Sequence, residues 1–380
     1  MSAPEIKGWC PGAHRPMMSG DGLVVRVRPR LARLTAAQAV GLCEAAQRHG
    51  NGTIDLTNRA NLQLRGVAEG SHEMLLDDLA ALDLLDREPG LESRRNILVQ
   101  PFHDGSDLTA RLARDLIARL RDLPPLPAKF GFAIDAGTTR CLAGNSADIR
   151  LETGCDDRLI LRADGQATGC ATTPDTAIDD LLELARWFAA NSDADHRRMA
   201  QLVRKTPLPA SWTGAAPAAI APDPMPGATP FGALLGAPFG QLPAGSLADL
   251  IQRSSATALR VTPWRLFLLE DAAPTAARCF VTHPDDPLLV TDACAGAPFC
   301  PQATVTTREI ARLLATRAQG SLHVSGCAKG CARPRPATVT LVGRDGRFDL
   351  VRDGCAWDEP SRHGLTADDL QALMSDPDAL

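Results

Sequence analysis

The sequence predicts an α+β protein built as a pseudo-twofold duplication. Three observations predict this fold class. A helix followed by an interrupted strand occurs near the start of the chain and again after residue 243. A longer outline of strand, helix, strand and two final strands also occurs twice. Between the copies, residues 207–243 contain nine prolines and no lysine or arginine, which is typical of a linker.

The first recurring pair begins with a helix that we predict at residues 35–50. Its apolar residues have helical spacing, Thr35 stands at the N-cap and Gly50 stands at the stop. Residues 53–65 then alternate apolar and polar side chains, as a half-buried strand does. Asn58, Arg59 and Ala60 interrupt this predicted strand.

The second copy repeats both patterns. We expect Ser246 to cap its helix and residues 258–270 to form its interrupted strand. In the first copy, the longer outline covers residues 94–102, a helix at 109–120 and residues 128–137. In the second copy, it covers residues 290–300, a helix at 307–318 with the capping box T-T-R-E, and residues 322–331. The boundaries that follow are 1–68 and 69–206 for the first copy, 207–243 for the linker, and 244–285 and 286–380 for the second copy.

Length and composition limit the function classes. The chain has 380 residues, 44% hydrophobic and 22% charged, as globular proteins of several domains have. No run approaches the length of a membrane span and the first residues do not form a signal peptide, so we expect a cytoplasmic protein without a membrane partner. The net charge of −5 argues against nucleic-acid binding. Residues 1–66 nevertheless carry nine basic and four acidic side chains, which indicates either an acidic ligand or a solvated basic face.

Four of the eleven cysteines lie in one region, at spacings C-x5-C and C-x3-C. They are Cys294, Cys300, Cys327 and Cys331. Cytoplasmic thiols stay reduced, so the set is more typical of a metal or redox centre than of disulfides. Both spacings are longer than the C-x2-C of structural zinc sites, which favours a 4Fe-4S cluster over zinc or four unconnected core thiols. Because only the second copy carries the set, we interpret it as functional. The other cysteines are interpreted as core or surface thiols. Cys10, in a Cys-Pro-Gly loop near the basic strand, is also interpreted as structural, with a place in the lining of the basic pocket as the alternative.

The segments D-A-C-A-G-A-P-F-C and H-V-S-G-C-A-K-G-C-A-R-P resemble the siroheme-type sulfite and nitrite reductases, and the resemblance covers nearly the whole chain. It implies ferredoxin-like half-domains for the two short units and nitrite/sulfite reductase 4Fe-4S domains for the two long ones, with the first long unit lacking a cluster. It also implies that the four cysteines hold a 4Fe-4S cluster, with Cys331 bridging to the siroheme iron. Siroheme carries eight carboxylates, which this family binds with basic residues of the first copy.

Five basic residues match those positions. Arg59 in L-T-N-R-A-N and Arg95 in R-R-N-I resemble arginines of the family, and Arg26 and Arg28 occupy the place of a first-strand arginine. Arg26 and Arg28 lie two residues apart and therefore share one face of a strand. The guanidinium fork suits carboxylates because it binds them through paired hydrogen bonds. Lys129 in A-K-F-G completes the set, and the alternative for each of these residues is a solvated surface position.

Gly131 is the main departure from the reductases, which carry a second lysine there. Glycine can neither donate a proton nor carry charge, so reduction of a small oxyanion loses support. This departure, the N-terminal run K-G-W-C-P-G-A-H-R-P and the segment P-A-K-F-G-F-A-I-D-A-G resemble the precorrin-3B synthase branch of the superfamily. That branch implies an oxygen-dependent monooxygenase of aerobic cobalamin biosynthesis, which hydroxylates precorrin-3A at C20 and forms a γ-lactone from the ring A acetate.

Under this interpretation precorrin-3A occupies the basic pocket and the cluster relays electrons for oxygen activation. NADH is implied as the ultimate reductant and would act through a separate donor, since no G-x-G-x-x-G follows a predicted strand. A mononuclear iron would be a further cofactor, but none of the eight histidines forms a metal-ligand pair, and we interpret His14 and His323 as structural. Two alternatives stay open, a siroheme-dependent sulfite or nitrite reductase and a non-catalytic cluster protein.

Overall fold

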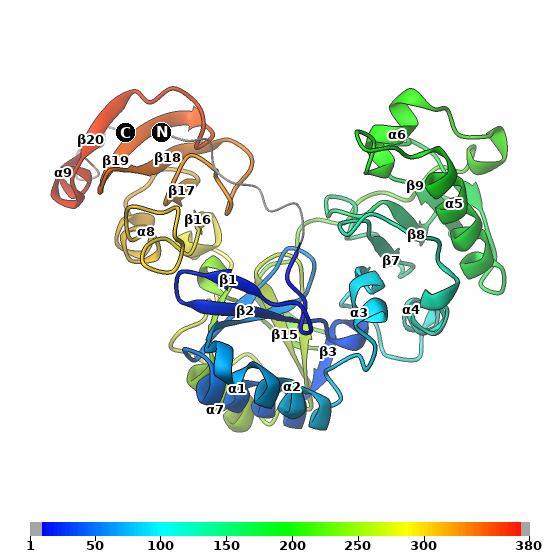
Figure 1. Cartoon of the computed structure of the whole chain (residues 1–380), viewed down its shortest axis with the longest axis horizontal. Coiled ribbons are helices and arrows are strands. Elements are labelled where there is room, and N and C mark those ends of the chain that lie inside the picture. The colour runs from blue at the N-terminus through cyan, green and yellow to red at the C-terminus, as the bar shows by residue number, and fades with distance from the viewer. Residues whose placement is uncertain (1–9, 374–380) are drawn as a thin grey trace.

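The computed structural model describes residues 10–373, which form three lobes (Figure 1). A central lobe contains the N-terminal strands together with strands from the middle of the chain, and two outer lobes stand on it. Lys7, which contributes to the basic balance of the first copy, and most of the residues considered for a signal peptide lie outside the described residues. In the described part of the chain, no helix is both long and apolar enough to cross a bilayer.

The central lobe contains two five-stranded sheets with matching strand orders. The first half of the chain supplies Met17–Ser19 (β1), Gly22–Val27 (β2), Arg33–Thr35 (β3), Thr53–Leu56 (β4) and Leu62–Val67 (β5). The second half supplies Gly227–Thr229 (β11), Gly232–Gly236 (β12), Gln241–Pro243 (β13), Ala258–Val261 (β14) and Leu266–Glu270 (β15). The orders are β1-β2-β5-β4-β13 and β11-β12-β15-β14-β3, so the predicted duplication is confirmed in this lobe.

Each half of the central lobe completes the sheet of the other. Strand β3 leaves the first half and pairs with β14, with Leu34 opposite Leu259. Strand β13 makes the reciprocal exchange and pairs with β4, with Leu242 opposite Ile54. One buried apolar core therefore runs through both halves, and its members include residues of both copies.

Three helices cover one side of the central lobe (Figure 1). They are Ala36–His49 (α1), His72–Ala81 (α2) and Ala244–Ser254 (α7). The predicted start of α1 is confirmed, since the Thr35 hydroxyl accepts from Gln38 N and the Gln38 side chain accepts from Thr35 N in a capping box. Helix α7 begins before the expected cap, because Pro243 is its N-cap and Ser246 lies inside the helix with its hydroxyl 3.3 Å from Cys279 Sγ.

The two outer lobes share one topology. The first contains Pro89–Arg94 (α3), Ile97–Val99 (β6), Leu108–Ala118 (α4), Phe132–Asp135 (β7), Ile149–Thr153 (β8), Leu159–Ala163 (β9), Cys170–Ala171 (β10), Ala177–Asn191 (α5) and Met199–Lys205 (α6). The second contains Thr291–Ala293 (β16), Arg308–Ala315 (α8), Leu322–Ser325 (β17), Ala337–Arg344 (β18), Arg347–Gly354 (β19), Arg362–Leu365 (β20) and Ala367–Leu373 (α9). In each sheet the first three strands pair in parallel and the later strands pair antiparallel.

The proline-rich segment is only partly a connection. Its earlier part follows the first outer lobe, where Pro217 bridges to Gly154 and Ala215 bridges to Gly169. From Gly227 onward it forms β11, β12 and β13, so the structured second half begins inside the segment that we expected to be a linker. These strands are short and contain few charged residues, so their alternation of apolar and polar side chains is weak. The prolines around them therefore led us to predict a linker.

Candidate functional site

The four clustered cysteines lie on two loops at one edge of the second outer lobe. Cys294 directly follows β16, and Cys327 comes two residues after the end of β17. These strands are parallel neighbours, so their carboxyl ends meet at the same edge of the sheet. Cys300 and Cys331 follow on the same two loops. The spacing seen in the sequence therefore arises from two adjacent strand ends.

The two cysteine loops contact each other through small residues. Gly326 N donates to Cys294 Sγ over 3.2 Å, and Thr304 N donates to Gly326 O over 3.3 Å. A Cβ atom at Gly326 would lie 2.6 Å from the Ala303 Cβ, so any larger side chain would push the loops apart. The hydrogen bond from Gly326 N therefore holds the Cys294 sulfur against the second loop.

Thr307 joins α8 to the first of these loops. The expected capping box of T-T-R-E is absent, since the N-cap of α8 is Thr307 and its side chain makes no capping hydrogen bond. Its hydroxyl instead donates to Cys294 O over 2.7 Å. It also lies against Gly296, whose φ of +69° suits glycine. The threonine thus fixes the cysteine loop in place of capping the helix.

The four thiols influence one another electrostatically. Burial raises the pKa of Cys327, and nearby Cys300 and Cys294 raise it further. The pKa of Cys331 is raised by burial and then by the same neighbours, while Lys329 opposes the shift. Among residues 10–373, no group of three or more His, Cys, Asp or Glu side chains is arranged to hold a single metal ion. Four cysteines on two adjacent loops nevertheless match in kind and number the all-cysteine donor set of a 4Fe-4S cluster.

Arg26 and Arg59 occupy a second site, in the central lobe. Arg26 is only 8% exposed, its guanidinium lies near Cys10, and its Nε has no partner among the described residues. Burial lowers the pKa of both arginines, and the nearby Cys10 acts in the opposite direction on each. A buried guanidinium with no carboxylate partner is stabilised when an anionic ligand enters.

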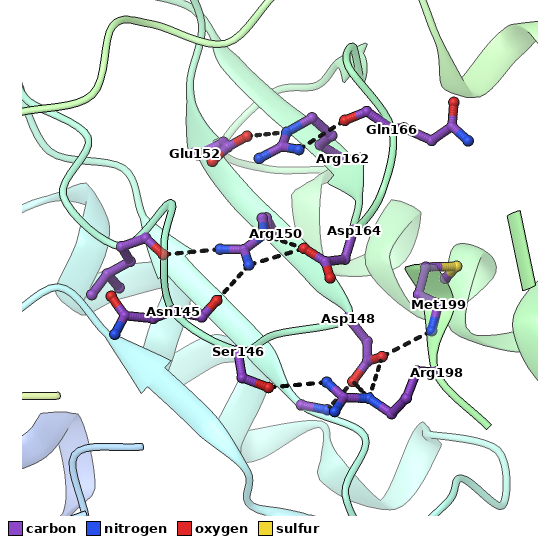
Figure 2. Close-up of polar contacts among 12 residues, drawn as sticks. Asn145, Ser146, Asp148, Arg150, Glu152, Arg162, Asp164, Gln166, Arg198 and Met199 are labelled. Carbon is purple, nitrogen blue, oxygen red and sulfur yellow. Dashed lines mark hydrogen bonds and ion pairs between the residues drawn. The ribbon is translucent and has the colours of Figure 1, made fainter. Parts of the chain in front are cut away.

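Arg198 joins this site from the first outer lobe. Arg59 donates to Lys129 O over 3.0 Å and to the Ser146 hydroxyl over 3.4 Å. Arg198 donates to the same hydroxyl over 3.1 Å and pairs with the fully buried Asp148 over 2.9 Å, as Figure 2 shows for the residues it labels. The proximity of Arg198 lowers the pKa of Arg59, after burial. Sequence reasoning missed Arg198, because a basic residue before a helix is also typical of a solvated surface.

Gly131 lies next to these cations. Its N–H donates to Asp148 over 2.9 Å, so the carboxylate that orients Arg198 also fixes the glycine. A Cβ atom at Gly131 would lie 3.2 Å from Asn96 O and 3.8 Å from an Arg59 nitrogen. The position where the reductases carry a second lysine is therefore bordered here by an arginine pair.

Arg28 and Arg95 do not contribute free guanidinium groups to this site. Arg28 forms a buried ion pair with Glu92, and burial lowers its pKa to about 10. Arg95 pairs with Asp86 over 2.7 Å and donates to Arg28 O over 2.6 Å. Glu92 also accepts from Ala13 N over 2.7 Å. We expected both arginines to bind ligand carboxylates; in the structure each pairs with a carboxylate of the protein, and the ligand-binding role of the two stays a prediction.

Of the remaining candidate residues, Lys129 lies at the basic site, whereas His14 and His323 lie away from it. Lys129 is half-buried beside Arg59, and its ammonium forms no ion pair within the described part of the chain. His14 contacts Asp86 O over 2.6 Å. His323 is fully buried in β17 and neither ring nitrogen has a partner among the described residues. Burial lowers its pKa to about 4, so it is neutral at physiological pH.

A buried arginine supports the loop that carries Ser146. Arg150 on β8 binds Leu142 O over 3.0 Å and Asn145 O over 2.5 Å, and its Nε donates to Asp164 over 3.0 Å (Figure 2). These contacts fix the backbone one residue before Ser146. The hydroxyl shared by Arg59 and Arg198 is therefore held by the sheet of the first outer lobe.

Comparisons with known proteins agree with this architecture. Residues 15–82 match the family described as the nitrite/sulfite reductase ferredoxin-like half domain. The solved structure of the Mycobacterium tuberculosis NirA protein superposes with a TM-score of 0.68 at 17% identity, covering 93% of this chain and 79% of that one. A ferredoxin–nitrite reductase of Synechococcus elongatus is 24% identical, over 88% of this chain and 78% of its own length.

The fold and the four-cysteine lobe thus define a member of the nitrite/sulfite reductase superfamily. A precorrin-3B synthase of Sinorhizobium sp is 32% identical to the chain, over 94% of this chain and 85% of that protein. The chain belongs to the precorrin-3B synthase family, which is a family of enzymes.

Proposed function

We propose that the chain catalyses the oxygen-dependent hydroxylation of precorrin-3A at C20, with formation of a γ-lactone from the ring A acetate, in aerobic cobalamin biosynthesis. One atom of dioxygen enters the product and the other leaves as water, with two electrons and two protons supplied by a donor. We propose NADH as the ultimate source of these electrons, through a separate protein in the cytoplasm. The name and the extent of the precorrin-3B synthase relative support the proposal.

The observation that carries the proposal is the composition of the basic site. Burial lowers the pKa of Arg59, and Arg198 and Arg26 lie close enough to lower it further. Gly131, which lies beside Arg59, has no side chain to donate a proton. Guanidinium groups stay charged and bind carboxylates through paired hydrogen bonds, so they suit a ligand with several carboxylates. Reduction of a small oxyanion requires proton donors beside it, which glycine cannot provide.

The residues of the chain divide into two roles. Arg26, Arg59, Arg198 and Lys129 bind and orient the carboxylates of the macrocycle, and the buried setting strengthens each contact because water does not compete. The four cysteines hold the redox group. When bound there, a 4Fe-4S cluster would supply single-electron transfer. Gly326 N donates to the Cys294 sulfur and fixes its position, which supports its role as a ligand.

Protein purified without oxygen provides the test. It is mixed with precorrin-3A and a chemical electron donor, and dioxygen labelled with a heavy isotope is then added. We expect a product that has gained one labelled oxygen atom, detected by mass spectrometry, and no product without dioxygen. An unlabelled product, or consumption of dioxygen without change to precorrin-3A, would overturn the proposal.

A siroheme-dependent reductase is the second candidate. The full cysteine set and the nitrite reductase relative favour it. Acid extraction of the anaerobically purified protein distinguishes the two. Siroheme in stoichiometric amount, together with turnover of nitrite or sulfite, would replace the first proposal. An iron-sulfur absorption without extractable siroheme would leave the pocket available for precorrin-3A and favour the monooxygenase.

A further inference from the structure

A single backbone carbonyl of the cysteine loop binds the central lobe. Phe299 lies between Cys294 and Cys300, directly before the second of them. Its carbonyl accepts from the Ser19 hydroxyl over 2.8 Å, from Gly20 N over 3.1 Å and from an Arg65 nitrogen over 3.3 Å. All three donors belong to the first ferredoxin-like half, so this carbonyl joins the four-cysteine lobe to the half that carries Arg59.

The contact is close enough to require glycine. A Cβ atom at Gly20 would lie 2.4 Å from Pro298 O and 3.1 Å from Phe299 O. No larger residue fits in the turn between β1 and β2 without moving the loop. The turn and the loop are thus packed directly against each other, and the hydrogen bonds lie inside this contact.

Arg65 is held rigidly where it makes this contact. Its side chain is 12% exposed and pairs with Asp21 over 2.9 Å. A second carboxylate, Asp55 on β4, lies 3.8 Å from Arg65 Nε and also pairs with Arg308 over 3.0 Å. Arg308 is the first residue of α8 and follows Thr307, which binds Cys294 O. Strand β5 therefore contacts the loop next to Cys300, and β4 contacts the start of α8, where Thr307 binds the Cys294 end of the loop.

The same hairpin also carries the proposed ligand site. Arg59 lies in the turn between β4 and β5, and Arg65 lies in β5. The two ends of one β-hairpin thus reach the basic site and the cysteine loop. A rigid hairpin transmits position between its ends because its backbone hydrogen bonds fix the register of the two strands.

We propose that Arg65 is a positioning residue, which holds Cys300 in place for the 4Fe-4S cluster through the Phe299 carbonyl. The inference rests on the proposed cluster and adds a role that the cysteine motif does not contain. Without the guanidinium, the Phe299 carbonyl loses one donor, Asp21 loses its ion-pair partner and Asp55 keeps only Arg308. The loop then moves more freely, and the cluster is released more easily and changes its redox behaviour.

The test compares three variants of the full chain, purified without oxygen. Arg65→Met removes the donor and the charge, Arg65→Lys keeps the charge, and Arg48→Met makes the same change at an arginine of α1 that is 59% exposed. Release of iron to a chelator and the reduction potential are measured for each protein. We expect roughly tenfold faster release from Arg65→Met, partial recovery in Arg65→Lys and wild-type behaviour in Arg48→Met.

Ser19→Ala keeps the proposal testable if Arg65→Met does not fold. This variant removes one donor to the Phe299 carbonyl and leaves the ion pairs of Arg65 in place. We expect a smaller change in the same direction. Wild-type release rates and potentials in Arg65→Met, or in Ser19→Ala when it is the only folded variant, would overturn the positioning role. Wild-type protein without iron and sulfide would instead overturn the proposed cluster, and the positioning role with it.

Discussion

Arg59 and Arg198 donate to one hydroxyl, that of Ser146, from two different lobes. Arg59 comes from the central lobe, and Arg198 precedes α6 in the first outer lobe. Two guanidinium groups that share an acceptor repel each other, and burial increases this repulsion. Both effects lower the pKa of Arg59, burial being the larger. A carboxylate-rich ligand would relieve the repulsion, which supports our proposal that these arginines bind such a ligand.

Arg59→Met therefore separates ligand binding from folding. We expect affinity for a carboxylate-rich tetrapyrrole such as precorrin-3A to fall roughly tenfold, since a hydrogen bond to a charged group is lost. The melting temperature should stay constant or rise, because a buried cation without a carboxylate partner is removed. Tetrapyrrole titration, a thermal melt and iron analysis check this. Equal losses of iron and of tetrapyrrole affinity would contradict the separation between the basic site and the cysteine loops.

Arg28→Met and Glu92→Gln should mainly affect stability. Each change leaves one buried partner of the ion pair without its counterpart, so we expect the free energy of unfolding to fall by about 3 kcal/mol in either variant. Arg30→Met is the control, because the pair of Arg30 with Asp83 is largely exposed and contributes less than about 1 kcal/mol. Denaturant unfolding measures all three variants. If Arg28→Met instead weakened tetrapyrrole binding without loss of stability, Arg28 would be a ligand-binding residue after all.

Cys331→Ser should remove the cluster. The thiol lies among the other three members of the set, and a hydroxyl is a poor ligand for iron in such a site. We expect iron and sulfide per chain to fall to a small fraction of the wild-type content. Cys155→Ser provides the control, since Cys155 is exposed and lies in another lobe. Retention of iron in Cys331→Ser, or loss of iron in Cys155→Ser, would show that the ligand set is different.

The buried His323 makes stability depend on pH. Burial lowers its pKa from 6.5 to about 4, with Arg333 acting in the same direction and Asp292 opposing it. Between these values the unfolded chain binds the proton more strongly, so stability is complete above pH 6.5 and falls as the pH approaches 4. The loss from this group is about 3 kcal/mol. His323→Leu should flatten the dependence in denaturant unfolding, and an unchanged slope would show that other groups cause it.

The sequence predicts the local elements well and the long-range partners poorly. Thr35 and Gly50 bound α1 as expected, since capping chemistry acts within a few residues. The spacing of the four cysteines indicates one site, because two parallel strand ends bring them together. Arg198 could not be found in this way. It meets Arg59 only through the packing of two lobes, and no motif marks such a contact in a single sequence.

Two further differences between the predictions and the structure also arise from contacts between residues far apart in the sequence. Alternation predicts that Arg26 and Arg28 share one face of a strand, but it does not reveal that both are buried or which of them has a protein carboxylate beside it. The strands β3 and β13 are three residues long, too short for a periodic signal, and each pairs with the opposite half. Their exchange is visible only in the assembled sheets.

The reciprocal exchange of β3 and β13 means that the two halves are interlocked. If a protease cut the chain near Pro217, the two fragments would stay associated. Each fragment supplies one edge strand to a sheet of the other fragment, β3 in one case and β13 in the other. The nicked protein should keep its shape, and the two fragments should recombine only with each other. The duplication therefore gave rise to one inseparable unit, in which neither copy can lose its neighbour and keep a complete sheet.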